Sequence, residues 1–85
     1  MRIWHVRFTD GLNTGVNTFE AADLPSAEQE AVQRALDYML IHDEIEDWSN
    51  WELHLAASTR YKDADPSAPV LLVLPFSALR RQNAA

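Results

Sequence analysis

Cysteine is absent from the 85-residue chain, and glycine occurs only twice, at Gly11 and Gly15. Without cysteine the protein has no disulfide framework, no thiolate zinc site and no cysteine nucleophile. Two glycines in one short segment also exclude a glycine-rich phosphate-binding loop. A small core must therefore be stabilised by hydrophobic packing or by self-association, without covalent cross-links.

Long apolar runs are missing as well. The longest, PVLLVLPF at residues 69–76, is far shorter than the roughly 20 residues of a membrane-spanning helix. The first residues, MRIWHVRFTDG, alternate polar and apolar side chains and lack the apolar stretch of a signal peptide. We therefore expect a cytoplasmic protein without a membrane partner, folded as one domain over residues 1–77 with a frayed tail at 78–85.

Basic residues are scarce in the middle of the chain. Between Asp10 and Ser58, eleven acidic residues accompany a single basic one, Arg34, so this segment carries a net charge of −10 in a chain of net charge −6. Direct binding to nucleic acid depends on Lys and Arg that neutralise phosphates. The charge distribution therefore predicts no direct contact with nucleic acid and favours a basic partner or an uncharged one.

The N-terminal segment predicts a β-hairpin. Residues 2–9, RIWHVRFT, have the period-2 alternation of a half-buried strand, and their inward face carries Trp4, Val6 and Phe8. The following DGLNTG, residues 10–15, contains residues that tolerate turn conformations. A second strand is expected near residues 16–20.

A helix is predicted to begin after Leu24 and Pro25. Ser26 is expected as its N-cap, with Gln29 three residues later completing a capping box. Apolar residues then recur at helical spacing and predict a face that covers a sheet, formed by Ala31, Val32, Ala35, Leu36 and Met39. The helix is expected to end between His42 and Glu46.

Two more strands are predicted in the C-terminal half. Residues 51–58 alternate, with Trp51, Leu53, Leu55 and Ala57 turned towards the helix, and residues 70–74, VLLVL, form the fourth strand. The element order is β-β-α-β-β. It predicts an α+β, two-layer domain in which one helix packs on one face of a four-stranded, mostly antiparallel sheet.

The fourth predicted strand is apolar on both faces. Its inward side chains are expected to be Val70, Leu72, Leu74 and Phe76, so that Leu71 and Val73 point away from the helix. A strand of this composition is typically central in its sheet and covered on both faces, whereas one helix covers only one face. We therefore predict that a second copy or another protein covers the open face, at Leu71, Val73, Ile3, His5 and His54.

Four segments carry most of these patterns: RIWHVRFTDG at 2–11, LPSAEQEAVQRAL at 24–36, WELHLAAS at 51–58 and PVLLVLPFS at 69–77. In order and spacing they resemble a family of small bacterial proteins that is known only as a domain of unknown function. The resemblance covers most of residues 2–77 and implies the same β-β-α-β-β fold. The family has no established activity, so the resemblance implies no catalytic residue and no cofactor.

Side chains that could hold a metal lie on the predicted open face. His5, Glu52 and His54 would form a transition-metal set if their strands were neighbours. Their spacing matches no metal motif, and polar residues are ordinary on the solvent face of a sheet. We therefore predict no metal, no cofactor and no catalytic residue. His42 and Glu46, four residues apart at the predicted helix end, could also hold a metal. The simpler interpretation is that an imidazole near a helix C-terminus complements the helix dipole.

The segment HDEIEDWSNWELH, residues 42–54, is interpreted mainly as a helix exit, a corner and a strand entry. Within it, Trp48 either packs under the corner or anchors a partner, as exposed tryptophan often does. The carboxylates form either a solubilising surface or a docking surface for a cationic partner; they are Asp43, Glu44, Glu46 and Asp47.

The favoured hypothesis is a small non-catalytic protein-interaction module that forms a homodimer through the open sheet face. The alternative is an acidic mimic of nucleic acid, which would inhibit a DNA- or RNA-binding enzyme by occupying its basic channel with the corner carboxylates, Asp37 and Glu52. A small metal-binding enzyme built on His5, Glu52 and His54 ranks third.

Overall fold

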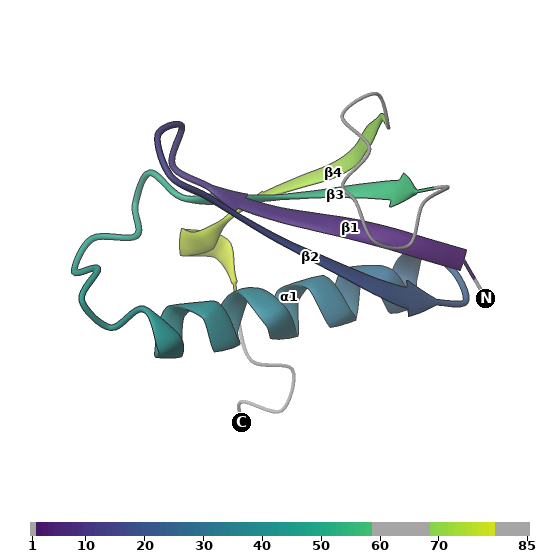
Figure 1. The fold of residues 1–85 in the computed structure, drawn as a ribbon, viewed down its shortest axis with the longest axis horizontal. Coiled ribbons are helices and arrows are strands. Elements are labelled where there is room, and N and C mark those ends of the chain that lie inside the picture. Colours follow the sequence, from purple (N-terminus) through teal and green to yellow (C-terminus); the bar gives the residue numbers. More distant parts are fainter. Residues whose placement is uncertain (1, 59–68, 80–85) are drawn as a thin grey trace.

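The computed structural model describes residues 2–58 and 69–79. Its elements are β1 (Arg2–Thr9), β2 (Thr14–Ala21), α1 (Leu24–Ile41), β3 (Glu52–Ser58), β4 (Val70–Pro75) and the 3₁₀ turn η1 (Phe76–Ala78). The strands form an antiparallel sheet in the order β2-β1-β3-β4, and α1 packs across one face of it (Figure 1). The predicted α+β class and the β-β-α-β-β order are confirmed.

The β1–β2 hairpin is closed by the predicted turn residues. One carboxylate oxygen of Asp10 accepts hydrogen bonds from the backbone N–H groups of Leu12 (2.8 Å) and Asn13 (2.7 Å), and Gly11 adopts a φ of 94°, which glycine tolerates best. Gly15 has a different role, because it lies within β2. A Cβ atom there would stand 2.9 Å from the ring of Tyr38, so the missing side chain lets α1 approach the strand.

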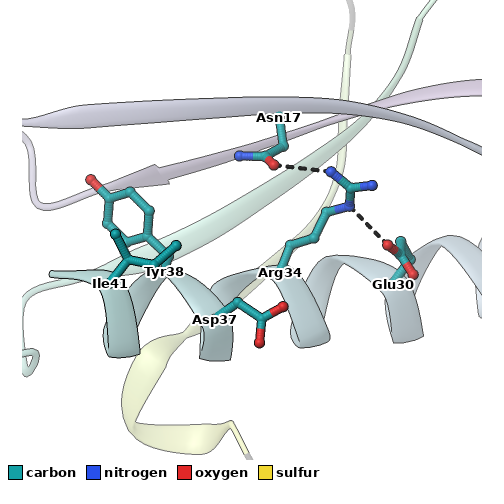
Figure 2. Close-up of a pocket in the computed structure, with 6 residues that line it drawn as sticks. All are labelled: Asn17, Glu30, Arg34, Asp37, Tyr38 and Ile41. Atoms are coloured by element: carbon teal, nitrogen blue, oxygen red, sulfur yellow. Dashed lines mark hydrogen bonds and ion pairs between the residues drawn. The ribbon is translucent and has the colours of Figure 1, made fainter.

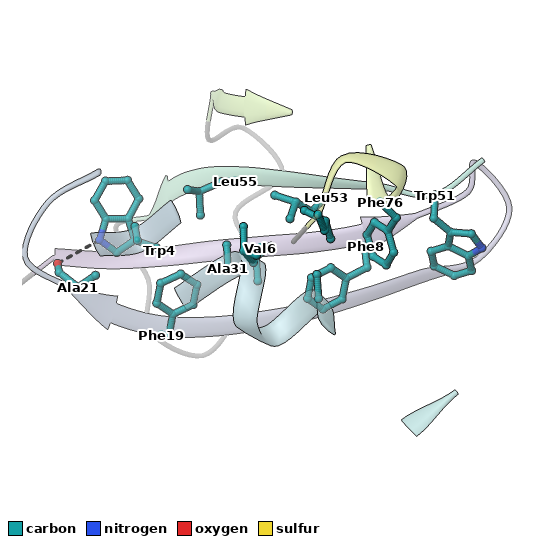
Figure 3. Close-up of a cluster of buried hydrophobic side chains, with 14 residues drawn as sticks. Trp4, Val6, Phe8, Phe19, Ala21, Ala31, Trp51, Leu53, Leu55 and Phe76 are labelled. Atoms are coloured by element: carbon teal, nitrogen blue, oxygen red, sulfur yellow. Dashed lines mark hydrogen bonds between the residues drawn. The ribbon is translucent and has the colours of Figure 1, made fainter. Parts of the chain in front are cut away.

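The core lies between the sheet and α1. Trp4 pairs in register with Phe19 of β2 and Ala57 of β3, and its indole Nε1–H donates to the carbonyl of Ala21 at 3.1 Å (Figure 3). The predicted inward faces of β1 and β3 and the predicted stripe of α1 are confirmed. The fully buried large side chains are Trp4, Phe8, Leu53, Leu55 and Val6.

The C-terminal limit of the core lies beyond residue 77. After β4 the chain turns back beneath the sheet through η1 (Figure 1), which buries Phe76, and Leu79 is only 9% exposed. Leu79 therefore belongs to the core, although the predicted tail began at residue 78. Residues 80–85 lie outside the described ranges.

The start of α1 differs from the prediction. Asp23 is the N-cap, and its side chain accepts a hydrogen bond from the backbone N–H of Ser26 at 3.0 Å. The predicted N-cap at Ser26 is wrong, because Leu24 and Pro25 already form the first turn, where proline is well tolerated. The predicted end is confirmed, with His42 as the C-cap.

This correction leads to a prediction about stability. Replacing Asp23 with alanine removes an acceptor for an otherwise unpaired N–H group. We expect the melting temperature to fall by about 4 to 8 °C, whereas Ser26→Ala, which leaves the backbone donor in place, should change it much less. Equal effects of the two substitutions in thermal unfolding would contradict the assignment of Asp23 as the cap.

The same cap has a defined pH dependence. Hydrogen bonds from the backbone and side chain of Ser26 lower the pKa of Asp23 below its ordinary value of 3.8. A carboxylate with a lowered pKa in the folded state stabilises fully above its unfolded pKa and loses its effect as the pH falls through the folded pKa. The difference between wild type and Asp23→Ala should therefore persist down to about pH 4 and vanish in stronger acid.

The position of β4 is also a correction. It is an edge strand, paired with β3 alone among the described strands, and not the central strand that its apolar composition predicted. A register shift between Leu55 and Ala56 leaves Leu71 as an extra residue, so that Val70 pairs with Ala56. Val70 therefore follows the face turned away from α1, and the prediction that it points inward is wrong. Leu72 and Leu74 point inward as predicted, opposite Leu55 and Leu53.

The outer edge of β4 is poor in free backbone donors. The N–H of Phe76 donates to the carbonyl of Trp51, directly opposite, at 2.9 Å, which sets the alternation of the antiparallel ladder. By that alternation the backbone groups of Val73 and Pro75 point away from β3. Pro75 has no N–H, and the bulge at Leu71 disrupts the regular spacing. Proline and bulges are the devices that keep edge strands from pairing with another chain.

Candidate interaction surface

Strand β4 carries a half-exposed apolar strip. Val70, Leu71 and Val73 are 48%, 46% and 46% exposed; we call these three residues the β4 strip. Val73 lies opposite His54 and Val70 opposite Ala56, so both follow the face that the helix does not cover. Within residues 2–58 and 69–79, the strip therefore offers apolar area that is in contact with solvent, as predicted for Leu71 and Val73.

The other predicted residues of this face differ in accessibility. Ile3 is partly exposed, and His5 is only 5% exposed. His5 lies opposite Ala56 of β3 and Thr18 of β2, in the middle of the face. His5 is therefore buried beneath this surface, whereas Ile3 and the β4 strip are accessible for contact.

His5 on β1 and the pair Glu52 and His54 on β3 lie on neighbouring strands. His54 lies opposite Arg7 of β1, and its Nε2 atom is 3.3 Å from the Oε1 atom of Glu52 on its own strand. Within residues 2–58 and 69–79, no group of three or more His, Cys, Asp or Glu side chains is arranged to hold a metal ion. The set of His5, Glu52 and His54 that alternation suggested is thus not assembled as a ligand sphere.

Trp48 packs under the corner between α1 and β3. Its ring stacks on Phe76, with centroids 5.4 Å apart and an interplanar angle of 12°. It also contacts Trp51 at 5.0 Å and Tyr38 at 6.0 Å. The side chain remains partly exposed. Of the two interpretations of Trp48, packing accounts for these contacts.

The corner carboxylates are all exposed: Asp43, Glu44, Glu46 and Asp47. The pKa of Glu44 is lowered by its own backbone N–H and by His42, whose Nδ1 atom lies 3.1 Å from Oε1. The pKa of Asp47 is lowered by hydrogen bonds from the side chain and backbone of Ser49. These local hydrogen bonds fix the conformation of the corner and favour the ionised form of its carboxylates.

A groove between β2 and α1 was not predicted from the sequence. Its volume is about 320 Å³, and its lining comes from both elements (Figure 2): Asn17, Glu30, Arg34, Asp37, Tyr38 and Ile41. The Nε atom of Arg34 donates to Glu30 at 2.9 Å, and Nη1 donates to Asn17 at 3.0 Å. The Glu30–Arg34 pair follows from helical spacing, whereas Asn17 joins it only through the tertiary fold.

No family model, no curated protein and no solved structure matches the chain. The resemblance to the bacterial family of unknown function stays a prediction. Among the described residues, no helix combines the length and the hydropathy that crossing a bilayer requires.

Proposed function

We propose that the protein is a non-catalytic protein-interaction module that forms a homodimer through the sheet face opposite α1. The β4 strip carries the proposal, because three large apolar side chains remain about half exposed on that strand. Contiguous exposed apolar patches are characteristic of interaction sites. Pro75 and the bulge at Leu71 disfavour pairing along the β4 edge, so contact through the face is the better use of this strip.

The charges on this face favour a second copy as the occupant. Arg7, Glu20 and Glu52 are exposed, and the strand register places all three on the side away from α1. In a two-fold interface the same patch meets itself, so a face with both signs of charge can pair Arg7 of one copy with Glu20 or Glu52 of the other. A face of only one sign would repel its copy.

The size of the face sets the expected affinity. Four strands present a surface about 15 Å wide and 25 Å long. Its flat projection, about 375 Å², is only about half of the roughly 800 Å² that each partner buries in a standard specific interface, so the contact should be weak. We expect a reversible dimer with a dissociation constant of about 1 to 100 µM, so the experiment must span that range of concentration.

Sedimentation equilibrium of the full chain tests the proposal. The wild type should change from monomer to dimer across the range given above, and Val73→Glu should weaken association by at least about tenfold, because it places a charge in the apolar contact. Leu40→Glu is the matched control, since Leu40 is 64% exposed on α1, away from this face, and it should dimerise like the wild type. A wild type that remains monomeric, or a Val73→Glu variant that dimerises normally, would refute the proposed interface.

The nucleic-acid-mimic alternative predicts a different response of binding to ionic strength. A complex held by the corner carboxylates and a basic channel should weaken steeply as ionic strength rises. A dimer held by the β4 strip should tolerate the same salt, because apolar contacts are not screened. Self-association that persists at high salt would support the β4 strip, whereas the mimic is tested by whether a basic nucleic-acid enzyme binds the protein at low salt and is released at high salt.

A further inference from the structure

The outer edge of β2 is a regular row of backbone hydrogen-bonding groups. The N–H of Asp10 donates to the carbonyl of Asn13, directly opposite, at 3.3 Å, and this bond sets the alternation of the β1–β2 ladder. Residues on β2 that face β1 therefore alternate with residues whose N–H and C=O point outwards. The outward set is Thr14, Val16, Thr18 and Glu20.

The β2 edge has neither a proline nor a bulge, the two features that hinder strand pairing at the β4 edge. The β1–β2 register runs without a shift from Arg2 and Ala21 to Thr9 and Thr14, and β2 contains no proline. Among the described strands, β2 ends the sheet. An unbulged, proline-free edge is a template for one more strand. The two edges of the sheet are thus unlike, and only β2 presents evenly spaced donors and acceptors.

The groove described above lies directly beside this edge. Asn17 of β2 forms part of its wall, and α1 supplies the rest (Figure 2). Side chains of an added strand would alternate between the open face and this groove. Ile41, 73% exposed, offers apolar contact at the mouth of the groove, and Tyr38 lines it beside Gly15.

The charge of the groove selects a basic side chain. Arg34 is already paired with Glu30 (2.9 Å) and lies over the ring of Phe19, 5.0 Å from its centroid. Asp37, in contrast, accepts a bond only from the neutral amide of Gln33, at 3.1 Å, among the contacts of the described residues. Two carboxylates and one guanidinium give the lining a net negative charge, so an incoming Lys or Arg can pair with Asp37.

We propose that the β2 edge and the adjoining groove bind an extended basic peptide segment, which joins the sheet as a fifth strand and places a Lys or Arg beside Asp37. In this binding mode the main-chain hydrogen bonds supply affinity and the pockets for alternate side chains supply specificity. The site is separate from the β4 strip, which lies at the other edge of the sheet. It does not depend on dimerisation.

The test uses a fluorescein-labelled synthetic peptide of about eight residues that alternates Val and Lys, titrated with the full chain and followed by anisotropy. Saturable binding is expected. Thr18→Pro should weaken it at least about tenfold, because it removes an outward N–H while leaving the β1 ladder intact, and Thr18→Val is the matched control that keeps the N–H. Asp37→Asn should weaken binding about 1.5-fold to fivefold.

A second measurement leaves the protein unchanged and covers the case in which Thr18→Pro fails to fold. N-methylation of every second peptide amide, in each of the two phases, should abolish binding in one phase and spare it in the other, because only alternate groups face β2. Absence of binding at about 1 mM peptide, equal binding by both methylated peptides, or sensitivity to Asp37→Asn alone would overturn the proposal. Because the readout is peptide binding, its outcome is independent of the sedimentation test of the β4 strip.

Discussion

Trp4→Ala is expected to remove a large part of the protein's stability at room temperature. Trp4 is 0% exposed, lies on β1 between β2 and β3, and donates its indole N–H to the carbonyl of Ala21 (Figure 3). Truncating a buried tryptophan to alanine costs about 3 to 5 kcal/mol. A chain of this length has a total stability of about 4 to 13 kcal/mol, and small domains bury less of their surface.

Two comparison variants separate packing from the hydrogen bond. Trp4→Phe keeps most of the apolar volume but leaves the carbonyl of Ala21 without its indole donor, so we expect an intermediate loss. Val16→Ala truncates a 43% exposed residue of the neighbouring strand and should cost less than about 0.5 kcal/mol. Urea denaturation followed by far-UV circular dichroism measures all three. Wild-type stability in Trp4→Ala would contradict the burial of Trp4 in the core.

Phe76→Ala is expected to have the second largest effect, about 3 to 5 kcal/mol. Phe76 is 3% exposed and joins three parts of the chain. Its ring stacks on Trp48 and lies 6.0 Å from the rings of both Trp51 and Phe8. It therefore ties the end of β4 to the corner before β3 and to the hairpin strand β1.

Besides lowering the stability of the whole protein, Phe76→Ala should change the surroundings of Trp48. Without the stacked ring, Trp48 should become more exposed, so the tryptophan emission of the folded protein should shift to longer wavelength. Ser77→Ala is the matched control, because Ser77 is the next residue and is exposed. A folded Phe76→Ala protein with unchanged emission and stability would contradict the packing of the corner.

The sequence patterns predicted the layers of the fold well, because strand alternation and helical spacing depend on local chemistry. Both buried faces, the hairpin turn and the end of α1 follow from neighbouring residues. The error at the helix start arose because Asp23 and Ser26 are both good N-caps. Pro25 would have decided between them, since proline favours the first helical turn and Asp23 immediately precedes that turn.

The position of β4 was harder to predict, because strand order is a tertiary property. Its apolar composition favoured a central strand, yet Pro69 and Pro75 flank it, and proline is confined to edges, strand starts and bulges. The groove could not be predicted at all. It joins Asn17 to Arg34, 17 residues apart, and depends on how closely α1 approaches β2 at Gly15.

The unlike edges of the sheet have a consequence for assembly. Strand addition that used both edges would repeat without limit and produce fibrils. Here Pro75 and the bulge at Leu71 terminate the sheet at β4, so growth by strand addition can occur only at β2. Two whole domains that paired through β2 would form a closed pair, because the joined sheet would end in a β4 edge on each side.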